Sequence, residues 1–412
     1  MNIALYHNLT SGGSKREAYE FAKQFVAHGH TFDLYHPRAA DEEFLPLEHL
    51  ARRTYVYDLQ VAAPFNGRLP LLRKYIDLYR LKKNLDASRA LAARIAAEMD
   101  ARAYDFVFLH HDQPVQSPYL LNFLQTSSVY YCAEPMREFY EPPIPRPYDE
   151  PQSRAERWQR KWYAPQRALR RWLIQTADAR NVRAAKLLLT NSFFSAESIY
   201  RAYGLRARVV YLGVDTEKFR PLDLPRENFV LSVGAISPLK GYDFLLEALS
   251  HVPEPLRPEL VLVGNTASQG ETLYLQKLAA ARNVALRFRV NVSEDELVQL
   301  YNRARALVYA PILEPFGFAP LEAMACEMPV VAVREGGVRE SVRDGETGLL
   351  VERDAQDFAN ALCRVLKDAS FAETLGKHGR ARILDFWTWE RAYERLMERV
   401  SGVKGSHVFT AP

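Results

Sequence analysis

Short apolar runs alternate with helical patterns along almost the whole chain, and this alternation limits the available folds more than any other feature. One group of runs ends near residue 212, and a second group begins at residue 229. Strands separated by helices predict parallel sheets that are covered on both faces. The predicted strands are 3–6, 32–35, 55–57, 106–109, 129–132, 187–190, 209–212, 229–233, 260–263, 285–290, 306–310, 330–333 and 349–351. The sequence therefore predicts an α/β protein with two Rossmann-like domains that face a cleft.

The length of 412 residues suits two or three domains. Residues 221–227 contain two prolines and mixed charge, which is typical of a linker. We therefore expect an N-terminal domain over 1–220 and a C-terminal domain over 221–387.

Composition excludes several classes of protein. With 48% hydrophobic and 25% charged residues, the chain resembles an ordinary soluble protein, and no apolar run approaches the ~20 residues that span a bilayer. The first residues form a predicted strand without the features of a signal peptide, so we expect a cytoplasmic location. Three scattered cysteines predict neither disulfides nor a zinc site. The net charge of +4 gives no reason to expect a nucleic-acid partner.

The stretch Glu314-Pro315-Phe316-Gly317-Phe318-Ala319-Pro320-Leu321-Glu322 connects a predicted strand to a predicted helix. Pro320 suits the first helical position, so the amides of residues 318–322 should point out of the helix start and form an anion site. Glu314 and Glu322 could hold the two ends of one ligand, and a nucleotide sugar has the matching layout. Alternatively, Glu322 only complements the helix dipole and Glu314 is a solvated loop residue.

Two further loops could approach a phosphate. Gly12 and Gly13 follow the first predicted strand and precede a helix, although a simple tight turn would also explain them. They do not form the G-x-G-x-x-G pattern of dinucleotide-binding proteins. In the loop of residues 234–241, Lys240 could reach a diphosphate, or it could be an ordinary surface lysine.

A histidine leaves the first predicted sheet at its carboxyl edge. His110 follows the run of residues 104–109 and could bind a sugar hydroxyl or transfer a proton. His111 is the alternative, because neighbouring residues of a strand point to opposite sides of the sheet.

These segments together resemble glycosyltransferase family 4. Residues 314–322 resemble the E-x7-E motif of retaining glycosyltransferases, with its E-x-F-G start. Residues 233–241 resemble V-G-R-L-x-x-x-K-G, but Ala235 stands where the family's phosphate-binding arginine stands. The resemblance implies the GT-B fold, with an acceptor-binding domain over 1–220, a nucleotide-sugar-binding domain over 221–387 and a helix at about 388–402 that packs back on the first domain.

The resemblance also implies the roles of individual residues. The expected catalytic residues are His110, Lys240 and Glu314. The expected donor-binding residues are Gly12, Gly13, Gly234, Ala235, Lys240, Val290, Glu314, Phe316, Gly317, Phe318, Ala319 and Glu322. No Asp-x-Asp sits at a predicted strand end, so we expect no metal and no cofactor other than the donor substrate.

The expected activity is same-face, retaining transfer of a hexose-type sugar from a nucleotide diphosphate to a glycan or a lipid-linked glycan. Two alternatives stay open. A nucleotide-sugar epimerase of the same architecture would convert the donor without an acceptor. A weakened nucleotide-sugar-binding protein would explain Ala235.

Two segments mix basic residues with large apolar ones. Residues 69–83 are one, and residues 154–186 are the other, with ten Lys or Arg against two acids and with Trp158, Trp162, Tyr163 and Trp172. Such helices can lie on an anionic membrane surface, which would make the protein peripheral at the inner face of the membrane. Alternatively, the charges form a solvated helix face and the aromatic residues pack in the core.

Overall fold

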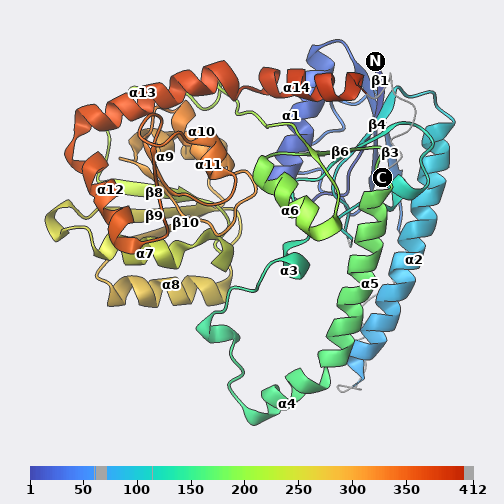
Figure 1. Cartoon of the computed structure of the whole chain (residues 1–412), viewed down its shortest axis with the longest axis horizontal. Helices are drawn as coiled ribbons and strands as arrows, with labels where there is room; N and C mark the ends of the chain where they lie inside the picture. The colour runs from blue at the N-terminus through green and yellow to red at the C-terminus, as the bar shows by residue number, and fades with distance from the viewer. Residues whose placement is uncertain (60, 62–71, 114, 403–412) are drawn as a thin grey trace.

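The chain forms two parallel sheets. The computed structural model describes residues 1–59, 61, 72–113 and 115–402. Within this part of the chain, the first sheet has the order β3-β2-β1-β4-β5-β6-β7 and the second the order β10-β9-β8-β11-β12-β13. Figure 1 shows the two sheets side by side, each with helices packed around it. The prediction of an α/β protein with two Rossmann-like parallel sheets is confirmed.

The strands lie close to the predicted runs, with one exception. They are β1 Asn2–Tyr6, β2 Thr31–Pro37, β3 Arg53–Tyr57, β4 Phe106–Leu109, β5 Ser128–Tyr131, β6 Leu187–Thr190, β7 Arg208–Val209, β8 Phe229–Val233, β9 Glu259–Gly264, β10 Leu286–Val290, β11 Leu307–Tyr309, β12 Val330–Val333 and β13 Leu349–Val351. The exception is the run 209–212, of which only Val209 belongs to a strand. Val210 and Leu212 are buried in the core beyond the strand, so their apolar character reflects burial and not strand pairing.

Helices cover both faces of each sheet. They are α1 Gly13–Ala27, α2 Arg73–Asp100, α3 Arg137–Tyr140, α4 Arg154–Trp162, α5 Ala164–Arg183, α6 Phe193–Tyr203, α7 Tyr242–Ser250, α8 Gln269–Ala281, α9 Glu294–Arg303, α10 Phe318–Ala325, α11 Val338–Ser341, α12 Ala355–Lys367, α13 Ala369–Phe386 and α14 Trp389–Ser401. Strand β4 shows the resulting pattern: Phe108 packs with α1 and α14, whereas Val107 packs on the opposite face with α2 and α5.

The chain crosses between the sheets twice at one place. The first crossing follows β7, and the second lies between α13 and α14, after which α14 packs against α1 (Figure 1). The two crossings are in backbone contact, because the Val214 amide donates to the Trp387 carbonyl oxygen at 2.8 Å. Gly213 has no room for a side chain, since a Cβ there would lie 2.4 Å from the Thr388 carbonyl carbon.

We call each sheet with the helices packed around it a unit: the first contains β1–β7 and the second contains β8–β13. A proline-rich segment, residues 141–151, also joins the two units, and we call it the strap. Arg146 in the strap is buried and forms ion pairs with Asp243 at 2.8 Å and Glu271 at 3.0 Å in the second unit. The Tyr148 hydroxyl donates to Glu271 at 2.6 Å, and its ring packs over Gly270. A buried arginine with two carboxylate partners holds the strap firmly against the second sheet.

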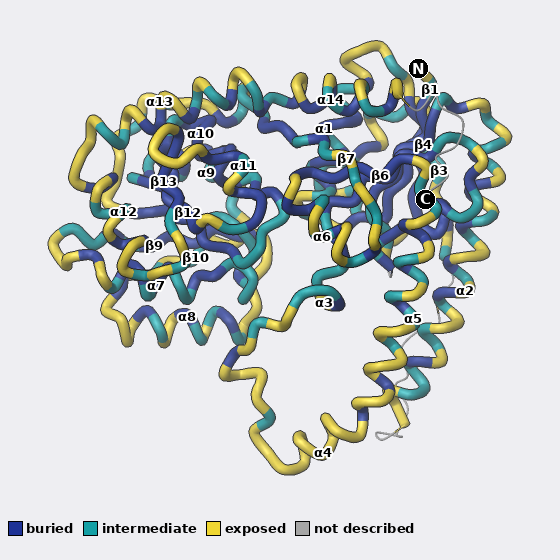
Figure 2. The backbone as a smooth tube through the Cα atoms, viewed as in Figure 1, coloured by how far each residue is buried: buried dark blue, intermediate teal, exposed yellow. Residues whose placement is uncertain are grey.

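Helices α4 and α5 follow the strap, and we call them the arm. The arm extends away from both sheets (Figure 1). Helices α2 and α5 run side by side, with α4 beyond the end of α5 (Figure 1), and α4 is exposed along its length (Figure 2). Trp158, Trp162 and Trp172 have exposed fractions of 53%, 43% and 59%, whereas Tyr163 is buried. Core packing is therefore the wrong interpretation for these three tryptophans. Of the segment 69–83, residues 69–71 lie outside the described residues.

No helix in the described ranges has the length and apolar character that crossing a bilayer requires.

We expect Gly213→Ala to destabilise the protein by about 2–4 kcal/mol, because the new methyl group would overlap the backbone of the second crossing. Urea and thermal unfolding would measure the loss. Gly402→Ala is the matched control, since a Cβ at the end of α14 would be 3.6 Å from its nearest neighbour. Equal stability of the two variants would show that the crossings are not tightly packed.

Candidate active site

Lys240 and Glu314 meet at the carboxyl ends of the neighbouring strands β8 and β11. Lys240 Nζ donates to Glu314 Oε2 at 2.8 Å. Two glycines allow this contact. A Cβ at Gly234 would be only 3.0 Å from Lys240 Cε, and a Cβ at Gly241, where φ is 62°, would be 2.1 Å from the Ala310 carbonyl oxygen. The β8 loop therefore folds closely over β11 and brings Lys240 to Glu314.

The backbone of Glu314 is held by neighbouring loops from both units. The Gly337 amide donates to the Glu314 carbonyl oxygen at 2.8 Å, and a Cβ at Gly336 would be 2.3 Å from the same oxygen. From the first unit, the Ser192 hydroxyl donates to the Pro315 carbonyl oxygen at 2.5 Å. The loop that carries Glu314 is thus fixed before any ligand arrives.

Helix α10 begins at Phe318, two residues before the predicted start at Pro320. The difference has a simple cause: the first four amides of a helix have no partner inside it, so proline is tolerated at the third position as well as at the first. Gly317 precedes the helix with φ of 86°, and a Cβ there would be 2.8 Å from the Tyr309 hydroxyl. The free amides of the first turn are therefore those of Phe318 and Ala319, with Gly317 just before them.

The side chains of this stretch pack and do not line an open site. Phe316 and Ala319 are buried, and the rings of Phe316 and Phe318 make an edge-to-face contact at 5.4 Å. Phe318 also lies beside the glycine loop of the first unit, because a Cβ at Gly13 would be 3.5 Å from Phe318 Cε2. The structure therefore brings the Gly12–Gly13 backbone next to the start of α10.

Glu322 is buried on α10, and both of its carboxylate oxygens have partners. Tyr301 donates to Oε2 at 2.6 Å, and Arg16 from α1 forms an ion pair with Oε1. The Arg16 guanidinium also lies over the Phe318 ring, 5.7 Å from its centre. The cavity between these groups measures about 20 Å³, which leaves room for roughly one water molecule.

His110 and His111 point to opposite faces of the first sheet. His110 packs on Phe108 and contacts Glu17 of α1 at 3.1 Å through Nδ1, on the same side as the glycine loop. His111 packs against Tyr130 on the other side. Burial lowers the pKa of His110 and raises the pKa of Glu17, so both groups favour their uncharged forms. The contact with Glu17 occupies Nδ1, and Nε2 has no hydrogen-bond partner among the described residues.

Several buried polar atoms at this edge have no hydrogen-bond partner in the described part of the chain. They are Asn8 Oδ1 after β1, His110 Nε2 and His111 Nε2 after β4, and Glu134 Oε2 after β5. Buried polar atoms without a partner are rare, and they are expected where a ligand or water supplies the partner. Strands β1, β4 and β5 are neighbours, so these atoms all lie at the carboxyl edge of the sheet, with His111 on the opposite face from His110.

Glu134 lies where the two units meet. Burial raises its pKa to about 7, Arg137 opposes the increase, and the Glu314 carboxylate adds to it. The Arg137 guanidinium is 3.7 Å from Glu134, and it donates to the Ile312 carbonyl oxygen at 2.6 Å. Glu134 and Arg137 therefore face the Lys240–Glu314 pair from the first unit.

Lys15, the neighbour of Arg16, is already paired. Its side chain is fully buried and forms an ion pair with Glu42, which also accepts from His7 at 2.9 Å. Burial opposes the charge of Glu42, but hydrogen bonds from His7 and Lys15 lower its pKa to about 2. Lys15 is therefore a structural cation.

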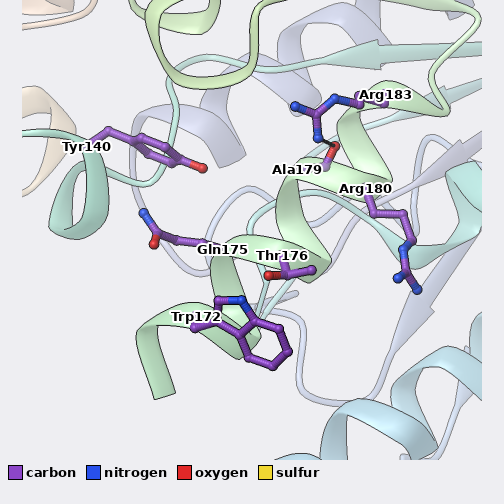
Figure 3. A pocket seen from close by; sticks show the side chains of 7 residues that line it. All are labelled: Tyr140, Trp172, Gln175, Thr176, Ala179, Arg180 and Arg183. Atoms are coloured by element: carbon purple, nitrogen blue, oxygen red, sulfur yellow. Dashed lines mark hydrogen bonds between the residues drawn. The ribbon is translucent and has the colours of Figure 1, made fainter. Parts of the chain in front are cut away.

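Other predicted residues lie apart from this cluster. Val290 ends the edge strand β10, which β9 separates from β8, and it is exposed. Ala235 follows Gly234 and offers no charge. A cavity of about 610 Å³ lies between α3 and α5, far along the chain from the predicted donor residues, and Figure 3 shows Trp172, Arg180 and Arg183 around it. In the described ranges, no group of three metal-binding side chains is close enough to hold an ion.

The sequence analysis missed Arg16, Glu134 and Arg137. Arg16 meets Glu322 across 306 positions of the chain, and no local pattern signals such a contact. Glu134 and Arg137 follow the carboxyl end of β5, so the rule that ligands bind beyond strand ends could have found them.

Comparison with known families gives a consistent result for both halves of the chain. A model described as Glycosyltransferase Family 4 matches residues 11–218, and one described as Glycosyl transferases group 1 matches residues 214–382.

The sequence relatives share a name but match only in part. A D-inositol 3-phosphate glycosyltransferase of Streptomyces bingchenggensis is 35% identical over 235 residues, which are 51% of this chain and 51% of that protein. One from Acidothermus cellulolyticus is 37% identical over 250 residues, 55% of each. The chain spans about half the length of the curated relatives it matches.

Solved structures match over nearly the whole chain. Sucrose-phosphate synthase of Thermosynechococcus elongatus has a TM-score of 0.70 at 21% identity and covers 98% of this chain and 99% of its own. Alr3699/HepE of Anabaena, in complex with UDP-glucose, has a TM-score of 0.68 at 19% identity, covering 98% and 100%. Identities this low show the fold alone, which is the GT-B fold.

The raised pKa of Glu134 gives a stability prediction with a definite sign. The folded protein keeps this proton up to pH of about 7, whereas an unfolded chain releases it near pH 4.5. Wild-type protein should therefore lose stability between pH 4.5 and 7 relative to Glu134→Gln, and the difference should be constant above pH 7. One pKa unit corresponds to ~1.4 kcal/mol, and partial exposure of the side chain reduces the whole effect to about 1–2 kcal/mol.

Urea unfolding at several pH values would measure this difference. Glu138→Gln is the control, because Glu138 is an exposed carboxylate only four residues away. A parallel pH dependence for wild type and Glu134→Gln would contradict the assignment.

Proposed function

The chain belongs to glycosyltransferase family 4, and from that premise we propose that it transfers a hexose-type sugar from a nucleotide diphosphate to a hydroxyl acceptor. The transfer retains the anomeric configuration and needs no metal ion. One observation carries the proposal: the amides at the start of α10 lie beside the Gly12–Gly13 loop of the first unit, and Glu314, which pairs with Lys240, comes four residues before α10 in the chain. The start of α10 thus follows a paired cation and carboxylate and contacts a glycine loop.

Each group has a role in this reaction. The bond from the anomeric carbon to the phosphate oxygen breaks, and negative charge grows on the departing diphosphate. Lys240 and the amides of residues 317–319 stabilise that charge, since preorganised donors act strongly where water is excluded. The acceptor oxygen bonds to the same face of the anomeric carbon, and its proton passes to the leaving phosphate. Glu314 and Nε2 of His110 bind sugar hydroxyls.

The nucleotide-sugar donor has outside support. Alr3699/HepE, which shares the fold, was solved with UDP and with UDP-glucose. For the acceptor we propose a glycan or lipid-linked glycan, and a test panel should include inositol phosphate because the sequence relatives are named for it.

Ala235 favours one alternative, a nucleotide-sugar-binding protein with weak or no turnover. Such a protein would bind the donor but neither transfer nor hydrolyse its sugar. An epimerase, in contrast, would convert the donor without any acceptor. Incubation with UDP-, GDP- and ADP-sugars, followed by mass spectrometry and by separation of sugar epimers, distinguishes the three activities.

We also propose that the arm lies against an anionic lipid surface. Three exposed tryptophans and Leu169 project from α4 and α5, among the ten basic residues of segment 154–186. The rings of Trp158 and Trp162 stack at 5.5 Å and form one apolar patch. Tryptophan suits the interface between water and lipid, and basic residues are attracted to anionic headgroups.

We expect Lys240→Ala to reduce sugar transfer, or donor hydrolysis without acceptor, by about a hundredfold, because one preorganised donor to a leaving group is worth about 10²–10³ in rate. Initial rates with the best donor of the panel measure the effect. Lys377→Ala is the control, since Lys377 is an exposed lysine on α13 paired with Glu373. If Lys240→Ala turned over the donor as fast as Lys377→Ala, Lys240 would have no part in the mechanism.

We expect the triple variant Trp158→Ser, Trp162→Ser, Trp172→Ser to lose cosedimentation with vesicles that contain phosphatidylglycerol. Neutral phosphatidylcholine vesicles should bind wild type weakly, and salt should weaken the anionic binding. Leu273→Ser with Leu384→Ser is the control, because these residues are about equally exposed on the second unit. Binding of the triple variant at the wild-type level would refute the proposed surface.

A further inference from the structure

The carboxylate of Glu322 is not free to bind a ligand in this structure. It is buried, and its two oxygens accept from Tyr301 and Arg16. The adjoining cavity of about 20 Å³ cannot admit a ribose ring. Any ligand group that reaches Glu322 must therefore displace a side chain. Tyr301 is fully buried, whereas Arg16 keeps 24% of its side-chain surface exposed, so Arg16 is the one that can move.

Arg16 lies close to where a diphosphate would bind. It is in the first turn of α1, directly after the Gly12–Gly13 loop, and its guanidinium lies over Phe318, the first residue of α10. Phe318 and Glu322 are four residues apart on one helix face, so a small rotation of the Arg16 side chain leads from the carboxylate to the free amides of the helix start. The charged group would travel along one helical turn.

The other cations near this point are already bound to protein groups. Lys15 pairs with Glu42, and Arg137 pairs with Glu141 and donates to a carbonyl oxygen of the second unit. Arg353 pairs with Glu335 and donates to two carbonyl oxygens beside β11. Among the cations named here, Arg16 is the one whose guanidinium already lies over the first residue of α10.

We propose that Arg16 is a second diphosphate-binding residue, supplied by the first unit, which exchanges Glu322 for the diphosphate when the donor binds. The exchange leaves Glu322 free to accept from the ribose diol. In the absence of ligand, the ion pair avoids an unpaired buried carboxylate, which would be costly. In the complex, the guanidinium binds two phosphate oxygens in the fork geometry that suits it. The inference rests on the proposed function, because it assumes a nucleotide diphosphate at this junction.

Calorimetric titration tests the exchange by comparing how tightly a nucleoside, its monophosphate and its diphosphate bind. The ligands are uridine, UMP and UDP, and the corresponding compounds of guanosine and adenosine. Arg16→Ala should weaken diphosphate binding by about tenfold or more, since a charge-assisted hydrogen bond is lost. Binding of the bare nucleoside should stay the same or improve, because the competitor for Glu322 is gone. Arg16→Lys should retain part of the preference for the diphosphate.

Lys23→Ala is the control, because Lys23 is a partly exposed basic residue of the same helix whose ion pair, with Glu20, stays within α1. If Arg16→Ala folds poorly, the double variant Arg16→Ala, Glu322→Gln removes the unpaired buried charge and should still lack the preference for the diphosphate. Equal weakening of nucleoside and diphosphate, or no weakening of either, would overturn the exchange. If wild type binds no member of any series, the proposed function fails instead.

Discussion

The geometry of the candidate site depends on the backbone contact between the two crossings of the chain. Gly213 and Thr388 approach so closely that no side chain fits between them, and the Val214 amide bonds to the Trp387 carbonyl oxygen. This contact sets where the carboxyl ends of the two sheets meet. The site is built from strand ends of both sheets, so this contact helps to set the distances within it.

Charged groups at the junction are paired both within the second unit and between the two units. Glu322 pairs with Arg16, Lys240 pairs with Glu314, and Glu340 of the second unit accepts from the amides at the start of α6. Buried charges are tolerated only when they are paired, so such a junction is stable without ligand. The exchange proposed for Arg16 would let a charged ligand replace an existing partner at such a junction. The small cavity at Arg16 agrees with this view.

The inner strands were predictable because they are buried on both faces, which makes their sequences continuously apolar, whereas the edge strands β3 and β10 carry exposed residues. The same reasoning placed a strand at 209–212, where burial without pairing gives an identical signal. The contact of Lys240 with Glu314 follows from two predicted strand ends. The exact start of α10 did not follow, because proline suits more than one position of the first turn.

Contacts between distant segments could not be read from the sequence at all. Arg16 looks like any basic residue at the start of a helix until the fold brings it to Glu322. The sequence also did not show which aromatic residues are exposed. Trp158 and Tyr163 belong to the same segment, yet Trp158 is half-exposed and Tyr163 is buried against the start of α2. The sequence pattern limits which residues can be buried. The tertiary arrangement determines which of these residues are in fact buried.

The strap and the arm are consecutive in the chain, and this gives the arm a physical connection to the site. Residues 137–151 run from Arg137, which contacts the loop before Glu314, to Arg146, which is held by Asp243 and Glu271, and then directly into α4. Asp243 is in the first turn of α7, three residues after Lys240. A surface that binds the arm therefore acts on a segment anchored beside both members of the Lys240–Glu314 pair. The five prolines of the strap restrict its backbone, and Arg146 fixes it to the second unit, so the arm begins from an anchored segment.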